Sequence, residues 1–464
     1  MQSRKYSSVY FDREKIRSKL IELDYKQARR LKGPIYCALI KELFEEGCNI
    51  WGEHLENLVA KEDFLFETKV IRDRVCDDME LMMSLFENMR IAEKVHIINP
   101  DEGFKMAVKC QYNILKLLEP HKKKYDWLLD DVYNIIIPIC EFIESFGIPN
   151  TSETIARIYF KIAQFSSDKE SSLPFAIKFM ERSLVLSRNE AWESDYVTER
   201  EFGVYPTLHL VAGRELSCFL LRYAKSVAKY DPKSAEELAH KATVAIAEVG
   251  LDKNKIQYGR ALLARVNYII QSEDYDGAMK ILQKVRKNVP NSTDATMPKI
   301  LSDLHLYEGI CVWNSKDKTG ALSKMEEALK FAVKSGEKHR EADILVAIGK
   351  VYAANVQEQR WAREAFKRAK YIFGELGDVL NRKKAHYMLA KLKADEIFPY
   401  FMDMLKDGTE NFCGFYNLRQ WKNSCQKFWH TMGVEELKEN KIYCLLEDEI
   451  KDTFAWSLQS SERH

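Results

Sequence analysis

The chain has 464 residues, 46% of them hydrophobic and 30% charged, and its 71 Lys and Arg residues nearly balance its 70 Asp and Glu residues. This length can bury a large core or a series of small ones, whereas the net charge of +1 gives no support to bulk binding of nucleic acid, which needs a basic excess. With only 19 Gly and 11 Pro residues, the composition argues against a sheet-rich protein with many tight turns and favours helices.

Residues 1–33 form an arm with a strong charge asymmetry. The arm carries ten basic residues against four acidic ones, a net charge of +6. Such an arm suits an acidic protein surface, for example that of a microtubule, through an attraction that salt screens. The alternative is a solvated or loosely helical terminus.

No membrane segment is expected. The first residues lack the apolar run of a signal peptide, and the most apolar stretch, residues 133–143, is about half as long as a membrane span. The ten cysteines include no C-x-x-C pair, so we expect reduced, mostly buried thiols in a cytoplasmic protein; Cys218, for example, lies in the apolar helical pattern SCFLL.

Residues 34–150 are predicted to form divergent helical hairpins. Apolar residues recur at helical spacing in residues 38–59 and 77–98. Breaks are expected at the proline-containing segments 99–101, 119–121 and 147–150. The sequence therefore predicts that a helical stack begins well before its regular part.

Residues 151–204 are predicted to form a degenerate repeat and an irregular link. Ala176, Met180 and Ser183 follow a helical stretch, residues 154–165, and have the spacing of four and three residues that places a stripe on one face of a helix. The link, from about residue 188 to residue 206, contains Trp192, Tyr196 and Tyr205.

Residues 205–395 contain four clearer repeats. Each has small or apolar residues spaced by four and three, and the first members of successive stripes lie 43, 43 and 41 residues apart. The four stripes are Ala235/Ala239/Ala242, Ala278/Leu282/Val285, Ala321/Met325/Ala328 and Ala362/Phe366/Ala369.

Glycines precede two of these stripes, and turn signals precede two others. Gly309 lies twelve residues before Ala321, whereas Gly349 lies thirteen before Ala362, which indicates one inserted residue in that turn. Residues 273–278, EDYDGA, predict a turn between two helices, and Asp231-Pro232 with a capping box from Ser234 to Glu237 predicts another helix start.

These repeats resemble the tetratricopeptide repeat, a pair of antiparallel helices with a small residue where the two cross. The resemblance implies an all-α, tetratricopeptide-type solenoid of helical hairpins. Residues 396–464 are expected to form a helical C-terminal cap whose tryptophans, among them Trp421 and Trp429, either seal the open hydrophobic end or dock a partner.

No motif for catalysis or cofactor binding is present. The sequence lacks the phosphate-binding loops, the G-x-S-x-G elbow and the H-E-x-x-H zinc signature, and its ten histidines form no metal-ligand pair. We therefore expect a binding protein, not an enzyme, with no cofactor and no metal.

The family resemblance implies where the concave groove of the solenoid lies. Counting back from each stripe gives Leu or Val at the position where chaperone-binding members carry a lysine clamp, so that clamp is absent and a mostly apolar groove is expected. Such a groove suits a partner helix. The candidate partner-binding residues are Arg260, Asn267, Trp313 and Lys350 in the groove, with Trp421 and Trp429 in the cap; the alternative for Trp313 is packing against its own repeat.

The C-terminal half further resembles ciliary and sperm-flagellar members of the tetratricopeptide repeat family. The resemblance rests on the four long-period repeats, on residues 384–394 (KAHYMLAKLKA) and on Arg419–Lys422 within YNLRQWKNS. It implies an axonemal component of cilia and flagella that docks or stabilises an inner-arm dynein, with dynein arm subunits and a MYND-zinc-finger protein as partners, and that supports sperm motility. The alternatives are a non-ciliary cytosolic assembly or adaptor subunit and an activity hidden in residues 34–150.

Overall fold

The computed structural model describes residues 24–98, 100–121, 124–148, 150–195, 205–251, 254–288 and 297–410, together with Arg419 and Asn423. Across these ranges every regular element is a helix, and the β pairing is limited to an isolated bridge between Glu193 and Thr207. The chain divides into two compact units, which are described separately: unit 1 is residues 1–226 with 244–250, and unit 2 is residues 227–243 with 251–464.

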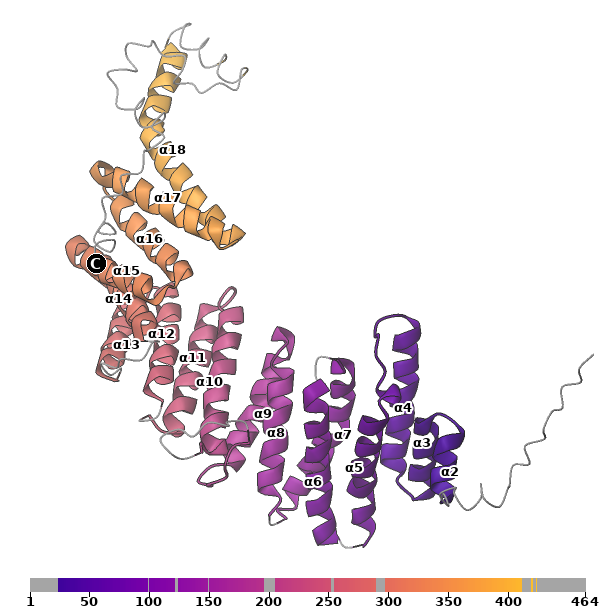
Figure 1. Cartoon of the computed structure of the whole chain (residues 1–464). Coiled ribbons are helices and arrows are strands. Elements are labelled where there is room, and N and C mark those ends of the chain that lie inside the picture. Colours follow the sequence, from indigo (N-terminus) through magenta and orange to yellow (C-terminus); the bar gives the residue numbers. More distant parts are fainter. Residues whose placement is uncertain are drawn as a thin grey trace, which may run out of the picture. The chain divides into compact units, whose positions relative to one another are not determined.

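Unit 1 is built from helices that pair with their neighbours in sequence (Figure 1), notably α5 with α6 and α8 with α9. Its helices are α2 (Tyr25–Lys32), α3 (Ile35–Glu45), α4 (Asn49–Glu67), α5 (Met79–Ile98), α6 (Pro100–Leu118), α7 (Asp126–Ser145), α8 (Ser152–Ser166), α9 (Leu173–Leu186) and α10 (Leu208–Val227). Short 3-10 turns lie at Val75–Asp77, Glu119–His121 and Glu170–Ser172.

Unit 2 is also built from helices that pair with their neighbours in sequence, notably α14 with α15 and α16 with α17. Its helices are α11 (Pro232–Glu248, whose last residues belong to unit 1), α12 (Lys255–Gln271), α13 (Tyr275–Asn288), α14 (Met297–Asn314), α15 (Lys318–Ser335), α16 (Lys338–Ala353), α17 (Gln359–Glu375) and α18 (Val379–Glu410). The fold is thus all-α, a tetratricopeptide-type solenoid of helical hairpins, as the repeat pattern predicts.

The repeat stripes are the buried seams of these hairpins. Every residue of the four long-period stripes is essentially inaccessible to solvent, and so are the three residues of the degenerate repeat in α9. Since a spacing of four and three residues keeps side chains on one helical face, the stripe of each second helix packs inwards. The stripes of both kinds of repeat are therefore the buried faces of their helices.

Two glycines permit the close helix crossing inside a hairpin. A Cβ atom added to Gly309 would lie 2.8 Å from Met325 Cγ, and one added to Gly349 would lie 2.6 Å from a ring carbon of Phe366. Both partners belong to the stripe of the following helix. The glycine and the stripe therefore form the two sides of one contact, which explains why the glycine precedes the stripe by about the same distance, twelve or thirteen residues, in both repeats.

A local turn starts two of the stripe-bearing helices. Glu273 and Lys316 adopt positive φ angles of 64° and 66°, and the aspartate that follows each one accepts a hydrogen bond from the backbone N–H of a glycine three residues later. The two donors are Gly277 and Gly320, at 2.9 and 3.0 Å. A side chain at either glycine would collide with the capping carboxylate, which accounts for the shared sequence D-x-x-G-A.

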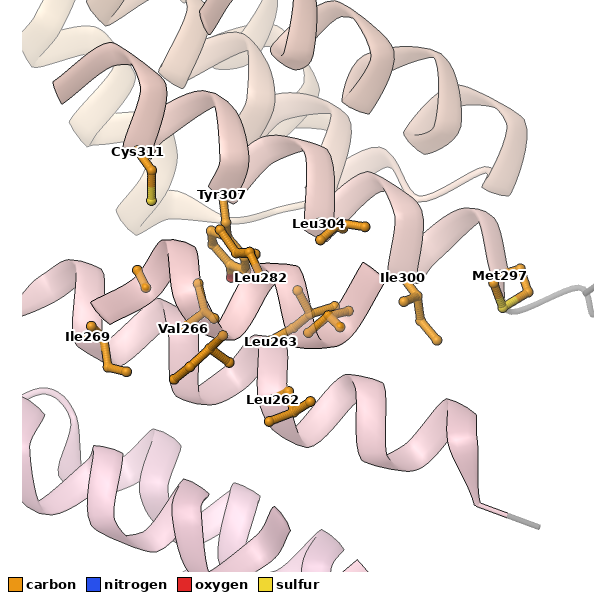
Figure 2. Close-up of a cluster of buried hydrophobic side chains, with 13 residues drawn as sticks. Leu262, Leu263, Val266, Ile269, Leu282, Met297, Ile300, Leu304, Tyr307 and Cys311 are labelled. Atoms are coloured by element: carbon orange, nitrogen blue, oxygen red, sulfur yellow. The ribbon is translucent and has the colours of Figure 1, made fainter. Parts of the chain in front are cut away.

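The core of unit 2 forms between successive hairpins as well as within them. Figure 2 shows Leu263 and Val266 of α12 facing Tyr307 of α14, with Leu282 of α13 among them. Ile300, Leu304 and Cys311 extend this cluster along α14. Each hairpin therefore buries apolar surface that it could not bury alone.

The breaks and inserted turns lie where the sequence predicts them. The extra residue before Ala362 falls in a connection that forms a 3-10 turn, Val356–Glu358, between α16 and α17. Helix α6 begins at Pro100, and Gly147 and Asn150 take positive φ angles after α7. Residues 384–394 lie within one long helix, α18, which continues through Pro399.

The stretch 38–59 forms parts of two helices, α3 and α4, which are joined at Gly47 with a φ angle of 80°. Two details differ from the sequence-based expectations. Helix α11 is capped by Asp231, which accepts hydrogen bonds from the N–H groups of Lys233 and Ser234, so the predicted box from Ser234 to Glu237 is not the cap. Five of the seven described cysteines are buried, but Cys218 and Cys37 are exposed.

In the part of the chain that the structure describes, each helix is either too short or too polar to span a membrane.

We predict that Gly349→Ala destabilises the protein by about 1–3 kcal/mol, because the new methyl group overpacks the contact with the Phe366 ring. Gly374→Ala, in the next helix, is the matched control: the nearest atoms to its added Cβ are 3.8 Å away, so a stabilisation of about 0.5–1 kcal/mol is expected from helix propensity alone. Urea unfolding measures both changes. Equal effects of the two substitutions would contradict the crossing role of Gly349.

Candidate functional site

The groove residues predicted from the repeat register lie on the first helices of the hairpins in unit 2. Arg260 and Lys350 are exposed, on α12 and α16, and Asn267 is partly buried on α12. Trp313 is partly buried on α14 and packs against the cluster that contains Met325 and Ile348. Trp313 therefore takes part in repeat packing, the alternative that the sequence left open.

The described residues do not form the open apolar groove that the repeat register predicts. The lysine-clamp position is the fifth residue of a repeat, and in the first three long-period repeats it is Leu220, Leu263 and Leu306. These leucines are buried, at 1%, 2% and 4% exposure. Leu263 and Leu306 belong to clusters that also contain residues of neighbouring helices in unit 2. Since these helices approach closely enough to cover their apolar side chains, the leucines stabilise the stack and are not available to a ligand.

A series of charged groups follows the first helices of unit 2 instead. Arg340 Nε of α16 lies 2.6 Å from Asp303 Oδ1 of α14, and Arg340 Nη1 lies 3.7 Å from Asp343 Oδ2. His339 links Asp343, at 3.3 Å, to Asp378, at 2.9 Å, just before α18. This charge ladder (Asp303, His339, Arg340, Asp343, Asp378) joins three successive hairpins.

Burial controls the ionisation of the ladder. Burial raises the pKa of Asp303 to about 6 in spite of the nearby Arg340 guanidinium, and Asp343 and Glu337 add to the rise. Burial likewise raises the pKa of Asp343, which His339 and Arg340 oppose. Burial thus makes Asp303 and Asp343 easier to protonate, whereas the hydrogen bond from the Asn381 backbone N–H lowers the pKa of Asp378.

A pocket of about 710 Å³ opens between α17 and α18, the last two helices of unit 2. Its lining carries four Lys or Arg side chains, one histidine and a single acidic residue, so the pocket is strongly cationic. The lining residues are Lys367, Lys370, Tyr371, Gly374 and Glu375 of α17 and Arg382, His386, Leu389, Ala390 and Lys393 of α18.

Large exposed apolar side chains also lie on α17 and α18, the two helices that form this pocket. Tyr371 and Tyr387 are 66% and 65% exposed, and Val379, Leu380 and Phe398 of α18 are exposed to a similar degree. Large exposed apolar groups that gather on two adjacent helices are typical of interaction sites. We call the pocket together with these five residues the α17–α18 face.

Three basic residues of the N-terminal arm are neutralised within the chain. Lys26, Arg29 and Arg30 of α2 form ion pairs with Glu46, Glu45 and Glu42 of α3 and its C-terminal end, and the pair between Arg30 and Glu42 spans 2.7 Å. These three cations therefore help to attach α2 to α3. The other basic residues of the arm up to Lys19 lie outside the described residues, as do Trp421 and Trp429.

Sequence reasoning did not find the α17–α18 face. The lysines occur singly among ordinary helical residues, and only the crossing of α17 and α18 brings Lys370 and Lys393 to the same pocket. The one sequence signal was the segment 384–394, which supplies His386, Leu389, Ala390 and Lys393 to the lining. Within the ranges that the structure covers, no group of three or more His, Cys, Asp or Glu residues is placed to hold a metal ion.

No protein-family model and no curated protein sequence matches this chain. Among solved structures, the apo form of RapI shares 13% identity with a TM-score of 0.38, over 77% of this chain and 97% of RapI. A signal transduction ATPase with a tetratricopeptide repeat sensor from Pyrococcus horikoshii shares 15% identity with a TM-score of 0.32, over 69% of this chain and 54% of that protein. A Rap protein complexed with Competence and Sporulation Factor shares 10% identity with a TM-score of 0.29, over 78% of this chain and 98% of that protein.

We predict that Asp303→Asn removes part of the pH dependence of stability. The folded-state pKa of Asp303, about 6, exceeds the ordinary aspartate value of 3.8, so the folded state binds more protons than the unfolded state between these values. This carboxyl group therefore stabilises the fold as the pH decreases from about 7 to 4, by an amount on the order of 1–3 kcal/mol. Urea unfolding at several pH values checks the prediction; a difference between the variant and the wild type that stays constant with pH would refute it.

Proposed function

We propose that the chain is a non-catalytic scaffold that binds an acidic, partly apolar segment of a partner protein on the α17–α18 face. The observation that carries the proposal is the pairing of a cationic pocket of about 710 Å³ with exposed aromatic side chains on the same two helices. Cationic side chains select acidic partners, and aromatic side chains at an interface supply much of the binding energy.

The rest of unit 2 has fewer side chains that are available to bind a partner. The first-helix leucines are buried, and the charge ladder satisfies its own members across the hairpins. By contrast, a single acidic residue, Glu375, lines the α17–α18 pocket beside its cations. The excess positive charge at this face favours a ligand that brings carboxylates.

A helix is the ligand form that best suits this face. The pocket lies along the crossing of two helices, and its apolar lining residues, Leu389 and Ala390, lie beside the charged Lys393. An amphipathic helix can set apolar residues into such a depression while its flanking Glu or Asp residues meet the lysines.

A finer proposal is that the partner is an inner-arm dynein of the ciliary or flagellar axoneme, with a MYND-zinc-finger protein in the same assembly and a role in sperm motility. Support comes from the family resemblance, one of whose motifs, residues 384–394, supplies four lining residues of the pocket. The second candidate, a cytosolic adaptor or assembly subunit outside cilia, is favoured by the same face, since acidic amphipathic segments are common in both settings.

We predict that Lys370→Glu combined with Lys393→Glu weakens the binding of an acidic amphipathic helical peptide about tenfold or more, because two attractions become repulsions. Fluorescence anisotropy with a labelled peptide carrying Glu beside Leu and Phe anchors measures the affinity. Lys330→Glu combined with Lys334→Glu on α15 is the matched control, as both lysines are exposed and lie away from the pocket. Equal losses in the two double variants would show a general charge effect and contradict the proposed site.

The axonemal assignment has its own test. Full-length protein should sediment with axonemes and co-purify with dynein heavy chains from ciliated tissue, and the double variant Lys370→Glu/Lys393→Glu should lose the heavy chains. Retention of peptide binding in vitro without any axonemal association would favour the cytosolic adaptor.

A further inference from the structure

Unit 1 contains a second cluster of cations, on α6 and α8, that is unrelated to the α17–α18 face. Lys116 and Tyr112 come from α6, and Arg157 and Lys161 come from α8. Lys161 is 2% exposed, and burial lowers its pKa despite its contact with Glu119, at 2.6 Å. Arg157, on the same helix, is nearly buried and pairs with Glu153 at 2.7 Å. With Lys116 the cluster therefore has three cations for two carboxylates, Glu119 and Glu153, which leaves a positive potential that favours a further anion.

A carboxylate of the chain itself occupies this cluster. Asp195 belongs to the irregular link after α9, and its Oδ2 accepts a hydrogen bond from the Tyr112 hydroxyl at 2.7 Å. Arg157 Nη1 lies 2.9 Å from Oδ1, and Lys116 Nζ lies 3.8 Å from Oδ2. The Tyr112 hydrogen bond and the nearby Arg157, Lys116 and Lys161 lower the pKa of Asp195 against the opposing effect of burial.

The link does not need this carboxylate to close. Ser194 donates its backbone N–H to Pro206 at 2.9 Å, and Leu208 donates to Trp192 at 2.7 Å, so the two ends of the link are joined by main-chain hydrogen bonds. Arg157 also donates to the Glu193 carbonyl oxygen at 2.8 Å. Asp195 itself remains 40% exposed at its side chain, which leaves it accessible to exchange with solvent and with other anions.

An open hollow adjoins the occupied site. Lys116 also lines a depression of about 590 Å³ between α5 and α6, together with Asn88 and Asn113. The two asparagines are themselves linked, with the Asn113 amide donating to Asn88 Oδ1 at 3.3 Å. Side-chain amides can both donate to and accept from a peptide backbone, so this hollow suits the chain that would flank an acidic residue.

We propose that Tyr112, Lys116, Arg157 and Lys161 form a recognition site for a carboxylate of a partner's acidic peptide, and that Asp195 occupies this site as an internal ligand. A partner then binds by displacing Asp195 and placing its neighbouring residues over Asn88 and Asn113. Because the internal carboxylate is present at an effective concentration of the order of millimolar, it suppresses weak external ligands. The proposal concerns a different surface from the one in the proposed function and stands without it.

The test measures binding of a labelled synthetic peptide with the sequence of residues 190–200, EAWESDYVTER, to the full chain by fluorescence polarisation. The variant Asp195→Asn should bind this peptide at least about tenfold more tightly than the wild type, since the internal competitor has been weakened. Adding Arg157→Met should reduce that affinity about tenfold, and adding the half-exposed Lys116→Met should reduce it roughly two- to fivefold. The peptide with Asn in place of its Asp is the matched control and should bind poorly to every variant.

Two results would overturn the proposal. One is that folded Asp195→Asn protein, checked by circular dichroism and thermal unfolding, binds the peptide no better than the wild type. The other is that the peptide with Asn binds as well as the peptide with Asp, which would show that the carboxylate is not recognised. A merely structural Asp195 predicts the first result together with a lower melting temperature.

Discussion

The close crossing of the two helices in each hairpin is the contact on which the rest of this structure depends. At Gly309 and Gly349 the helices approach so closely that a single added methyl group would collide with the stripe of the next helix. That approach lets one stripe of small and apolar residues be fully buried in every repeat. Because the crossing sets where each following helix lies, it also determines which side chains meet between hairpins, including those of the charge ladder and of the α17–α18 face.

The fold could be predicted from the sequence because its determinants are local and repeated. The spacing of Ala321, Met325 and Ala328 indicates which face of their helix is buried. Gly309, twelve residues earlier, indicates where the first helix of the hairpin crosses the second. The inserted residue before Ala362 could also be predicted from the sequence, and the structure has a 3-10 turn there. Repetition supplies several independent instances of the same pattern, so a single irregular repeat does not obscure it.

The candidate sites could not be predicted in the same way. The fifth-position leucines were expected to line an open groove. Whether such side chains contact a ligand or one another depends on the distance between neighbouring hairpins. The register of the repeats in the sequence does not give that distance. Asp195 and Arg157 are 38 residues apart in sequence, and the tertiary packing of the link alone brings them to 2.9 Å. Trp313 was interpreted either as an anchor for a partner or as a packing residue of its own repeat; the structure shows it packed against the cluster with Met325, and its contact with a partner stays a prediction.

The balance of charged side chains distinguishes the two candidate sites from the rest of the described surface. In most places opposite charges are paired between neighbouring helices, as for Arg340 with Asp303 and Arg182 with Glu144. At the α17–α18 face cations outnumber the one lining acid. In the cluster around Arg157, one of the three paired carboxylates, Asp195, comes from an irregular link. Hydrogen–deuterium exchange of the full chain with and without an acidic amphipathic peptide tests the central claim most directly: protection confined to residues 359–410 would support binding at the α17–α18 face, whereas protection along α12, α14 and α16 with none on α17 and α18 would contradict it.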